Sequence, residues 1–316
     1  MDILVFGAGV CGSYIASELF LSGQNVTVLA RGERLKHVRE NGIMIRHPLQ
    51  KSWTTAAVPV IDMLRPDAYF DLVLVAVRHT DLDGVIPSLA GNKKCPFYIF
   101  LGNNVDIRGV SKRFSDASRL AFGFPPSGGH IEKGIVYSYH KNRPVLTLGE
   151  TLGRESTRLY NVADAFHETP VRVAVSPNID AWLKYRIALV NPLISVIQSA
   201  GGDLTKLARD DKKLNLFFEA AKEGIKVLEE LHYPDEPSST IRLMKMHSAL
   251  LAPYFRHQLL SGAFGPAVRE QAMTEADEMA ELADEFMALR AHTSAVTPAL
   301  DELYAQMERS PQPLNV

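Results

Sequence analysis

With 316 residues, 46% of them hydrophobic, the chain is long enough to bury a large core, and its length favours two domains. Its 34 basic and 36 acidic side chains leave a formal net charge of −2. The chain therefore has no overall positive field that would hold a nucleic acid or an anionic membrane. A small neutral or mono-anionic ligand is the expected partner. Two cysteines, Cys11 and Cys95, exclude a disulfide framework and a cysteine-based zinc site.

The first half of the sequence alternates short apolar runs with helical spacing. The runs that predict strands cover residues 3–6, 26–29, 70–77 and 97–101, and helical spacing follows the first of them over 14–21. Continuous apolar runs are typical of parallel strands that are buried on both faces. We therefore predict an N-terminal α/β domain of the doubly wound, Rossmann type.

Two later segments, 134–140 and 144–150, interleave polar and apolar residues around a predicted turn at residues 142–144. This pattern predicts an antiparallel hairpin. The last expected strand covers 171–175, and a breaker follows it at residues 176–178. The predicted domains are therefore 1–177 and 178–316.

The second domain has the pattern of an all-α domain. Its predicted helices cover 179–200, 211–232, 239–260, 270–292 and 298–307. The N-terminus lacks the pattern of a signal peptide, and no apolar stretch is long enough to span a bilayer. We expect a cytoplasmic protein that does not enter the membrane.

The sharpest local motif is Gly7-Ala8-Gly9-Val10-Cys11-Gly12, a G-x-G-x-x-G between the first strand and the first helix. The first glycine permits the tight turn, the second lets a pyrophosphate approach the backbone, and the third allows close packing of the helix. The helix N-terminus at Val10 and Cys11 offers unpaired N–H groups to phosphates. The motif predicts a dinucleotide site.

The second strand ends at Arg31, about twenty residues beyond the glycines. An acidic residue at this point binds the ribose of NAD, whereas an arginine suits the 2′-phosphate of NADP. Glu33 keeps NAD open as an alternative. We predict NADP(H) as the cofactor.

Two further strand ends carry polar residues that could reach the cofactor crevice. Arg78 follows the run 70–77, where it is either a phosphate ligand or a solvated surface group. Asn103 and Asn104 follow the run 97–101, and a turn accounts for one of them. The other, which we place at Asn103, could bind the cofactor ribose or a substrate oxygen.

These segments together resemble the ketopantoate reductase (2-dehydropantoate 2-reductase) family over essentially the whole chain. The resemblance rests on ILVFGAGVCGSYIA with Arg31, on LGNN, on IDAWLKYRIALVNPL and on TEADEMAEL. It implies a reductase of 2-keto acids in which Lys184 is the general acid, Glu275 binds substrate from a late helix, and Asn103 and Asn191 orient the substrate. Independently, Lys184 and Asn191 are seven residues apart, so a helix presents both on nearly one face.

Two departures from the family pattern concern the substrate. Ala188 stands where the family has an asparagine, and the residues before Glu275 lack the usual basic and polar run. Whether the substrate is ketopantoate or a different keto acid therefore depends on the pocket near Ala188 and Ser261. A non-catalytic NADP-binding sensor is the alternative from another class. No histidine spacing indicates a metal. A second copy of the chain, in a homodimer, is a candidate partner.

Overall fold

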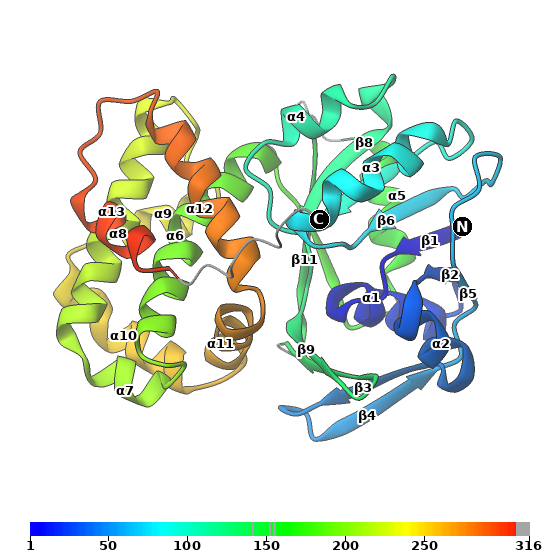
Figure 1. Cartoon of the computed structure of the whole chain (residues 1–316), viewed down its shortest axis with the longest axis horizontal. Helices are drawn as coiled ribbons and strands as arrows, with labels where there is room; N and C mark the ends of the chain where they lie inside the picture. Colours follow the sequence, from blue (N-terminus) through cyan, green and yellow to red (C-terminus); the bar gives the residue numbers. More distant parts are fainter. Residues whose placement is uncertain (141, 152, 154–155, 308–316) are drawn as a thin grey trace, which may run out of the picture. The chain divides into compact units, whose positions relative to one another are not determined.

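The computed structural model describes residues 1–140, 142–151, 153 and 156–307. Its contacts divide the chain into two units, Met1–Asp180 and Ala181–Val316, and each is described by itself (Figure 1). The domain boundary that the sequence indicates, after residue 177, stays a prediction. The predicted fold class, an α/β domain followed by a helical one, is confirmed.

An eight-stranded sheet is the centre of the first unit. Its strands are β1 (Asp2–Phe6), β2 (Asn25–Leu29), β5 (Val60–Ile61), β6 (Leu72–Val75), β7 (Tyr98–Leu101), β8 (Leu120–Phe124), β11 (Val145–Glu150) and β12 (Arg172–Val175). Their order is β12-β11-β8-β7-β6-β1-β2-β5. All strands from β8 to β5 are parallel to their neighbours, and β11 joins β8 antiparallel. The chain order reverses between β1 and β6, which places a topological switch point there.

Helices cover both faces of this sheet, which explains the continuous apolar runs of its strands. The helices are α1 (Val10–Leu21), α2 (Gly32–Asn41), α3 (Leu82–Gly91), α4 (Ile107–Lys112) and α5 (Thr157–Ala165), with short 3-10 turns η1 (His79–Asp81) and η2 (Ala117–Arg119). On one face, Ile3 and Val5 join a core with residues of α1 and α5. On the opposite face, the rings of Tyr98 and Phe100 pack against Phe114, which follows α4.

A second sheet of four strands packs on the other side of α1, so that α1 lies between the two sheets (Figure 1). Its strands are β3 (Ile43–His47), β4 (Ser52–Ala56), β9 (Gly128–Glu132) and β10 (Ile135–Tyr139), in the order β4-β3-β10-β9. Along β3, residues 43, 45 and 47 are buried while Arg46 is exposed. The sheet thus has one face toward α1 and one face toward solvent.

The prediction that 134–140 and 144–150 form a hairpin is wrong. Segment β10 pairs with β9 and β3, whereas β11 pairs with β8 and β12 in the larger sheet. Alternating residues indicate that a strand is half-buried, but they do not indicate its partner. Strands β3, β4, β5, β8 and β9 were not among the predicted elements.

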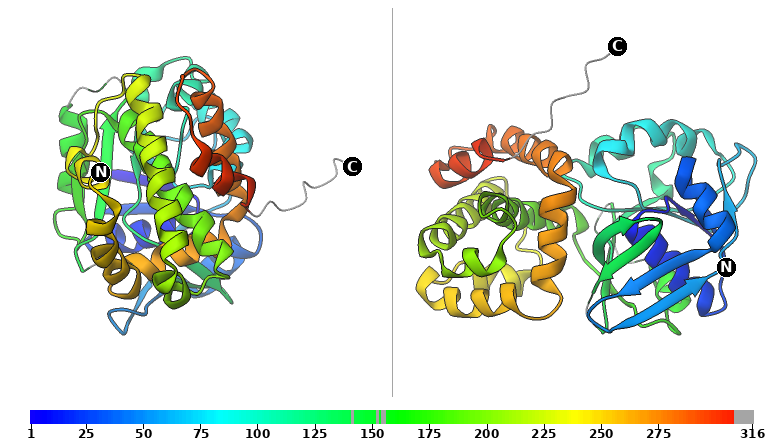
Figure 2. Two further views of the ribbon diagram at one scale, coloured as in Figure 1. Left: turned by 90° about the vertical axis from the view of Figure 1, so that its left-hand side faces the viewer. Right: turned by 60° about the horizontal axis from the view of Figure 1, so that its bottom comes forward.

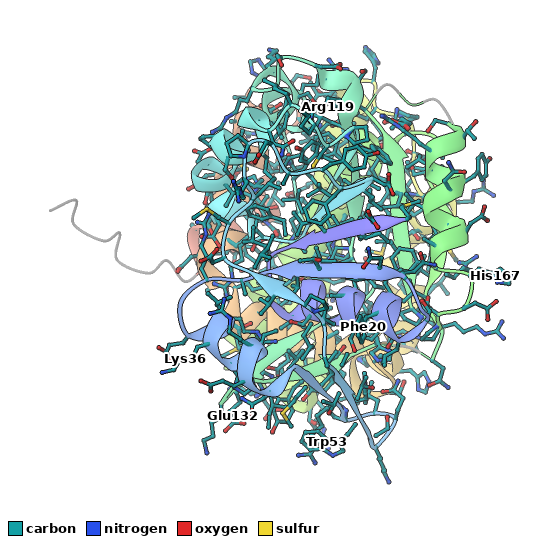
Figure 3. The ribbon with its side chains drawn as sticks, turned by 90° about the vertical axis from the view of Figure 1, so that its right-hand side faces the viewer. Phe20, Lys36, Trp53, Arg119, Glu132 and His167 are labelled. Atoms are coloured by element: carbon teal, nitrogen blue, oxygen red, sulfur yellow. The ribbon has the colours of Figure 1, made fainter. Side chains whose placement is uncertain are left out.

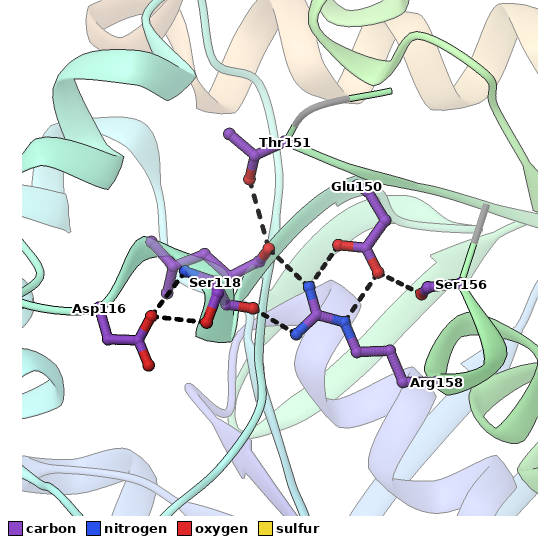
Figure 4. A network of polar contacts seen from close by, with 7 residues as sticks. Asp116, Ser118, Glu150, Thr151, Ser156 and Arg158 are labelled. Atoms are coloured by element: carbon purple, nitrogen blue, oxygen red, sulfur yellow. Dashed lines mark hydrogen bonds and ion pairs between the residues drawn. The ribbon is translucent and has the colours of Figure 1, made fainter. Parts of the chain in front are cut away.

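A polar network anchors α5 to the sheet (Figure 4). The Arg158 guanidinium pairs with the Glu150 carboxylate and donates to the backbone oxygens of Ser118 and Leu120. Its carbon atom Cζ lies 4.2 Å from the centroid of the Phe97 ring. Glu150 is buried, and the Ser156 hydroxyl donates to it as well. These bonds join α5 to β8 and β11.

In the second unit, the described residues form helices joined by loops, as two further views show (Figure 2). Its helices are α6 (Ile179–Ser199, which begins in the first unit), α7 (Leu204–Arg209), α8 (Asp211–Glu230), α9 (Ser238–Met244), α10 (Ser248–Leu260), α11 (Phe264–Thr274), α12 (Ala276–Arg290) and α13 (Pro298–Ala305). Helix α6 carries apolar residues around most of its circumference, because its neighbours bury it. No described helix has the length and apolar character needed to cross a bilayer.

Two predicted long helices are each divided in two. Residues 239–260 form α9 and α10, and the His247 side chain accepts a hydrogen bond from the backbone N–H of Ala249 where α10 begins. Residues 270–292 belong to α11 and α12, which are separated at Glu275 (φ −124°, ψ 31°). Helical periodicity continues across both breaks, so the pattern alone did not reveal them.

Candidate dinucleotide site

A cavity of about 770 Å³ opens at the carboxyl ends of the central parallel strands. Its lining includes Gly7 after β1, Ala30 and Arg31 after β2, and Val77 after β6. These strand ends flank the switch point, where open α/β sheets bind their ligands. The sequence therefore brings its glycine loop and Arg31 to one cavity.

The three glycines of the loop face different constraints. Gly7 has φ +111°, and a Cβ there would lie 2.4 Å from the carbonyl oxygen of Ala76. A Cβ on Gly12 would lie 1.9 Å from the carbonyl oxygen of Gly7. A Cβ on Gly9, by contrast, would have no heavy atom within 4 Å, and Gly9 lines the cavity. Gly7 and Gly12 are thus required by the fold, whereas a side chain on Gly9 would occupy space in the cavity.

Helix α1 begins at Val10, directly beside the cavity. The first N–H groups of a helix lack intrahelical acceptors and lie at its positive end, which favours an anion. The Ser13 hydroxyl donates to the Ala8 carbonyl at 2.9 Å, and the Cys11 thiol donates to the Ser127 carbonyl at 2.9 Å. Both bonds fix the loop and helix against their surroundings.

Two arginines near the start of α2 have different environments. Arg31 is exposed and lines the cavity, and no hydrogen bond or ion pair joins it to another described side chain. The Arg34 guanidinium donates to the Ala8 carbonyl at 2.8 Å, to the Gly134 carbonyl at 2.6 Å and to the Ser13 hydroxyl at 2.9 Å. Burial lowers the pKa of Arg34 below its ordinary value. Arg31 is available to a ligand, and Arg34 is committed to the protein.

The turn between β9 and β10 forms a further wall of the cavity. Ile131, Lys133 and Gly134 are lining residues, and Lys133 (φ +48°) with Gly134 (φ +81°) makes the two-residue turn. Lys133 is exposed, and within the described chain no acidic side chain pairs with it. Sequence reasoning missed Lys133. A Lys-Gly turn was visible, but nothing local connects residue 133 with residue 31.

Other residues expected near the cofactor occupy different surroundings. Arg78 is exposed and precedes η1, while Asn103 and Asn104 are buried in the loop after β7. None of these three belongs to the described lining of the cavity. Their cofactor and substrate roles stay predictions.

In the helical unit, Lys184 and Asn191 both lie on α6 and are both buried. The Lys184 ammonium lies 4.9 Å from the centroid of the Tyr233 ring. The Asn191 amide donates to the Met279 carbonyl at 3.0 Å, which joins α6 to α12. Asn191 therefore already has a structural bond within its unit.

The remaining two predicted substrate residues lie at helix ends. Glu275 is half-buried and stands between α11 and α12, rather than inside one late helix as expected. Ser261 follows α10, and its hydroxyl donates to the His257 carbonyl at 2.6 Å. Their substrate contacts also stay predictions.

The parallel sheet, the glycine loop at its switch point and the helix that begins at the cavity together define a protein of the Rossmann-type dinucleotide-binding class. Residues 3–151 match the family model described as "Ketopantoate reductase PanE/ApbA". This segment, just under half of the chain, is similar to the ketopantoate reductase family. The matched description names a reductase, and this indicates an oxidoreductase that uses a nicotinamide cofactor.

Individual relatives are distant in sequence but extend over most of the chain. The 2-dehydropantoate 2-reductase of Pyrococcus horikoshii is 21% identical over 235 residues, which are 72% of this chain and 73% of the relative. The crystal structure of 2-dehydropantoate 2-reductase from Geobacter metallireducens is 16% identical, with a TM-score of 0.76, over 97% of this chain and 98% of that one. A ternary structure of D-mandelate dehydrogenase with NADH and anilino(oxo)acetate is 14% identical, with a TM-score of 0.78, over 97% and 96%. These structural likenesses concern the fold.

Proposed function

We propose that the protein is an NADPH-dependent reductase of a 2-keto acid. The observation that carries the proposal is the cavity at the switch point, in which the open position at Gly9, the start of α1 and the exposed Arg31 meet. The match of residues 3–151 to the ketopantoate reductase family supplies the reaction class. When bound, the cofactor supplies the hydride that reduces the carbonyl carbon.

The preference for NADPH over NADH rests on two cations. Arg31, directly before α2, and Lys133, in the β9–β10 turn, line the same cavity, and neither has an acidic partner among the described residues. A 2′-phosphate can accept from both, whereas the ribose hydroxyl of NADH offers them no charge. Glu33 also lines the cavity, and it would disfavour the phosphate by repulsion. Asp81 lines the cavity as well, and Arg34 is committed to the protein, so the preference for NADPH depends on direct pairing of Arg31 and Lys133 with the 2′-phosphate.

Lys184 is the residue that we propose as the proton donor. Hydride addition to a ketone develops negative charge on the oxygen, and an ammonium group stabilises this charge and delivers the proton. The Tyr233 ring beside Lys184 supports a defined position of the ammonium group. Glu275, Asn103, Asn191 and Ser261 are proposed to hold the substrate.

The substrate that we favour is a 2-keto acid other than ketopantoate. Ala188 is fully buried on α6, and a Cβ placed on Gly224 of α8 would lie 3.0 Å from the Ala188 Cβ. Helices α6 and α8 therefore pack closely at the position where the family pattern has an asparagine, and that polar contact is missing. Ketopantoate itself remains the alternative within the family, and a non-catalytic NADP-binding sensor is the alternative outside it.

We also propose a homodimer that works in the cytoplasm. Helices α9 and α10 and the turn between them expose four large apolar side chains, Leu243, Met246, Leu250 and Tyr254. Leu250 and Tyr254 are four residues apart on α10 and therefore lie on one side of that helix, as part of a surface that a second copy can cover. Light scattering should detect a dimer that Leu250→Glu dissociates, and an unchanged mass for this variant would contradict the role of this surface.

The function is tested by a screen of 2-keto acids, each incubated with NADPH or NADH, in which cofactor absorbance reports turnover. We expect at least one keto acid to be reduced, with NADPH preferred. Arg31→Met, Lys133→Met and the double variant separate the two cations, and each single change should reduce the NADPH preference by roughly tenfold or more. Tight NADPH binding without turnover of any keto acid would instead favour the sensor. Equal affinity for NADH and NADPH would contradict the cofactor assignment.

A further inference from the structure

The solvent face of the four-stranded sheet carries an ordered row of side chains that the proposed reaction does not use. Trp53 of β4 is opposite Arg46 of β3, Arg46 is opposite Tyr137 of β10, and Tyr137 is opposite His130 of β9. One residue from each strand therefore stands in the same register position. Trp53, which Figure 3 labels on the small sheet, is 54% exposed, an unusual exposure for so large an apolar surface.

The row holds the Arg46 guanidinium between two aromatic rings. Its Cζ atom lies 5.5 Å from the centroid of the Trp53 ring and 5.7 Å from that of the Tyr137 ring. Tyr137 is in turn stacked on His130, with the ring centroids 4.8 Å apart and the planes inclined by 9°. No hydrogen bond or ion pair connects the Arg46 side chain with another described residue. The ring contacts thus orient the guanidinium while its N–H donors stay available.

A hollow of about 430 Å³ lies at the Trp53 end of this row. Five residues of β3, β4 and the turn between them line it, namely Arg46, Pro48, Lys51, Ser52 and Trp53. Lys51 is exposed and has no acidic partner among the described residues. No described residue lines both this hollow and the cofactor cavity. Two cations without acidic partners among the described residues and an indole therefore meet at a separate concave surface.

We propose that this hollow is a second binding site, for a small anion that carries a flat, unsaturated ring. The Trp53 ring offers a stacking surface to the planar part, and Arg46 and Lys51 offer charge to the anionic part. The volume suits a ligand of one ring and one acidic group, such as an aryl phosphate or an aryl carboxylate.

The charge and size of the site decide against other ligand classes. A neutral aromatic molecule would leave both cations without a partner, and a simple inorganic anion would leave the indole uncovered. A nucleic acid needs a basic surface that extends well beyond two side chains, and the formal net charge of the chain is −2. Because the rings already orient Arg46, binding immobilises little beyond Lys51 and the ligand.

The probe for the test is phenyl phosphate, with phenol and inorganic phosphate as the two partial ligands. Trp53 and Trp182 are the two tryptophans of the chain, so the full-length Trp182→Phe protein reports on Trp53 alone. We expect phenyl phosphate to change the Trp53 fluorescence saturably and to bind roughly tenfold more tightly than phenol or phosphate. Equal affinity for phenol and phenyl phosphate, or a change that does not saturate, would overturn the proposal.

Variants locate the binding event. Arg46→Gln and Lys51→Gln should each weaken phenyl phosphate by about tenfold, since each removes one charged contact. Arg31→Gln is the matched control, because it removes a cation from the cofactor cavity and should leave the Trp53 titration unchanged. The urea midpoint of each variant verifies its fold. If Arg46→Gln folds and binds as well as the parent, or if Arg31→Gln weakens binding equally, the site is not the hollow.

Discussion

Replacing Arg34 by methionine tests whether hydrogen bonds from this arginine to the protein hold the wall of the cofactor cavity in place. Arg34→Met keeps most of the aliphatic chain and removes three hydrogen bonds, to Ala8, Gly134 and Ser13. Two of these partners belong to the glycine loop and the start of α1, and the third belongs to the β9–β10 turn. The substitution therefore releases the turn that carries Lys133.

The expected loss follows from the number and charge of these bonds. A hydrogen bond from a charged donor contributes about 1.5 to 3 kcal/mol, so three bonds at the lower end contribute roughly 4.5 kcal/mol. Arg34 is half-buried, and water can replace part of what its partners lose, which reduces the expected loss to about 3 kcal/mol. This corresponds to about a hundredfold change in the unfolding equilibrium of the first unit. The affinity for NADPH should fall as well, because the turn is no longer held at the cavity.

Urea unfolding of the Trp182→Phe protein measures this change, since Trp53 belongs to the first unit and reports on it alone. Arg31→Met is the control, because Arg31 is exposed and has no partner in the described chain. It should change the free energy of unfolding by less than about 0.5 kcal/mol and still reduce NADPH preference. If Arg34→Met unfolds like the parent, or if both variants destabilise equally, the distinction between the two arginines is refuted.

Three other predictions test separate parts of the molecule. Gly9→Val should abolish NADPH binding in calorimetry and leave the urea midpoint unchanged, because its side chain enters only the cavity. Gly12→Val, by contrast, should prevent folding of the first unit. Retained NADPH binding by Gly9→Val would contradict the phosphate-loop assignment. Burial and the neighbouring His140 lower the pKa of His47 from 6.5 to about 4. The unfolded chain therefore binds this proton more readily, and stability should fall by about 2 kcal/mol from pH 7 to pH 5 in urea unfolding, a slope that His47→Gln should reduce. Lys184→Ala should lower kcat by roughly 10²- to 10⁴-fold with NADPH affinity retained, and Lys184→Arg should bind substrate but turn over slowly; normal turnover of Lys184→Ala would reject the proton donor.

Sequence patterns were most informative where a short segment contains its own structural reason. The runs 3–6, 70–77 and 97–101 became buried parallel strands, because a strand covered on both faces must be apolar throughout. The glycine loop was recognisable because its steric demands recur at fixed spacing. Arg31 was recognisable because it ends the second strand of the same unit.

The site also depends on residues whose positions no local pattern contains. Lys133 reaches the cofactor cavity only because β9 and β10 join β3, which lies some ninety residues earlier in the chain. Alternation within 134–140 indicated a half-buried strand. It did not indicate which distant strands join it in the sheet that packs on α1. The predicted pairing with 144–150 failed for this reason.

The sequence by itself determined the α/β class, the helical second half, the glycine loop and Arg31, because each depends on spacing within a few turns or strands. Only the tertiary structure decided that Arg34 is committed to Ala8 and Gly134, that Lys133 is available beside Arg31, and that the Asn191 amide bonds to α12. Arginine, lysine and asparagine look alike in a sequence whether their polar atoms meet a ligand or the protein's own backbone. Which of these they meet depends on contacts between segments far apart in the chain, and such contacts exist only in the folded molecule.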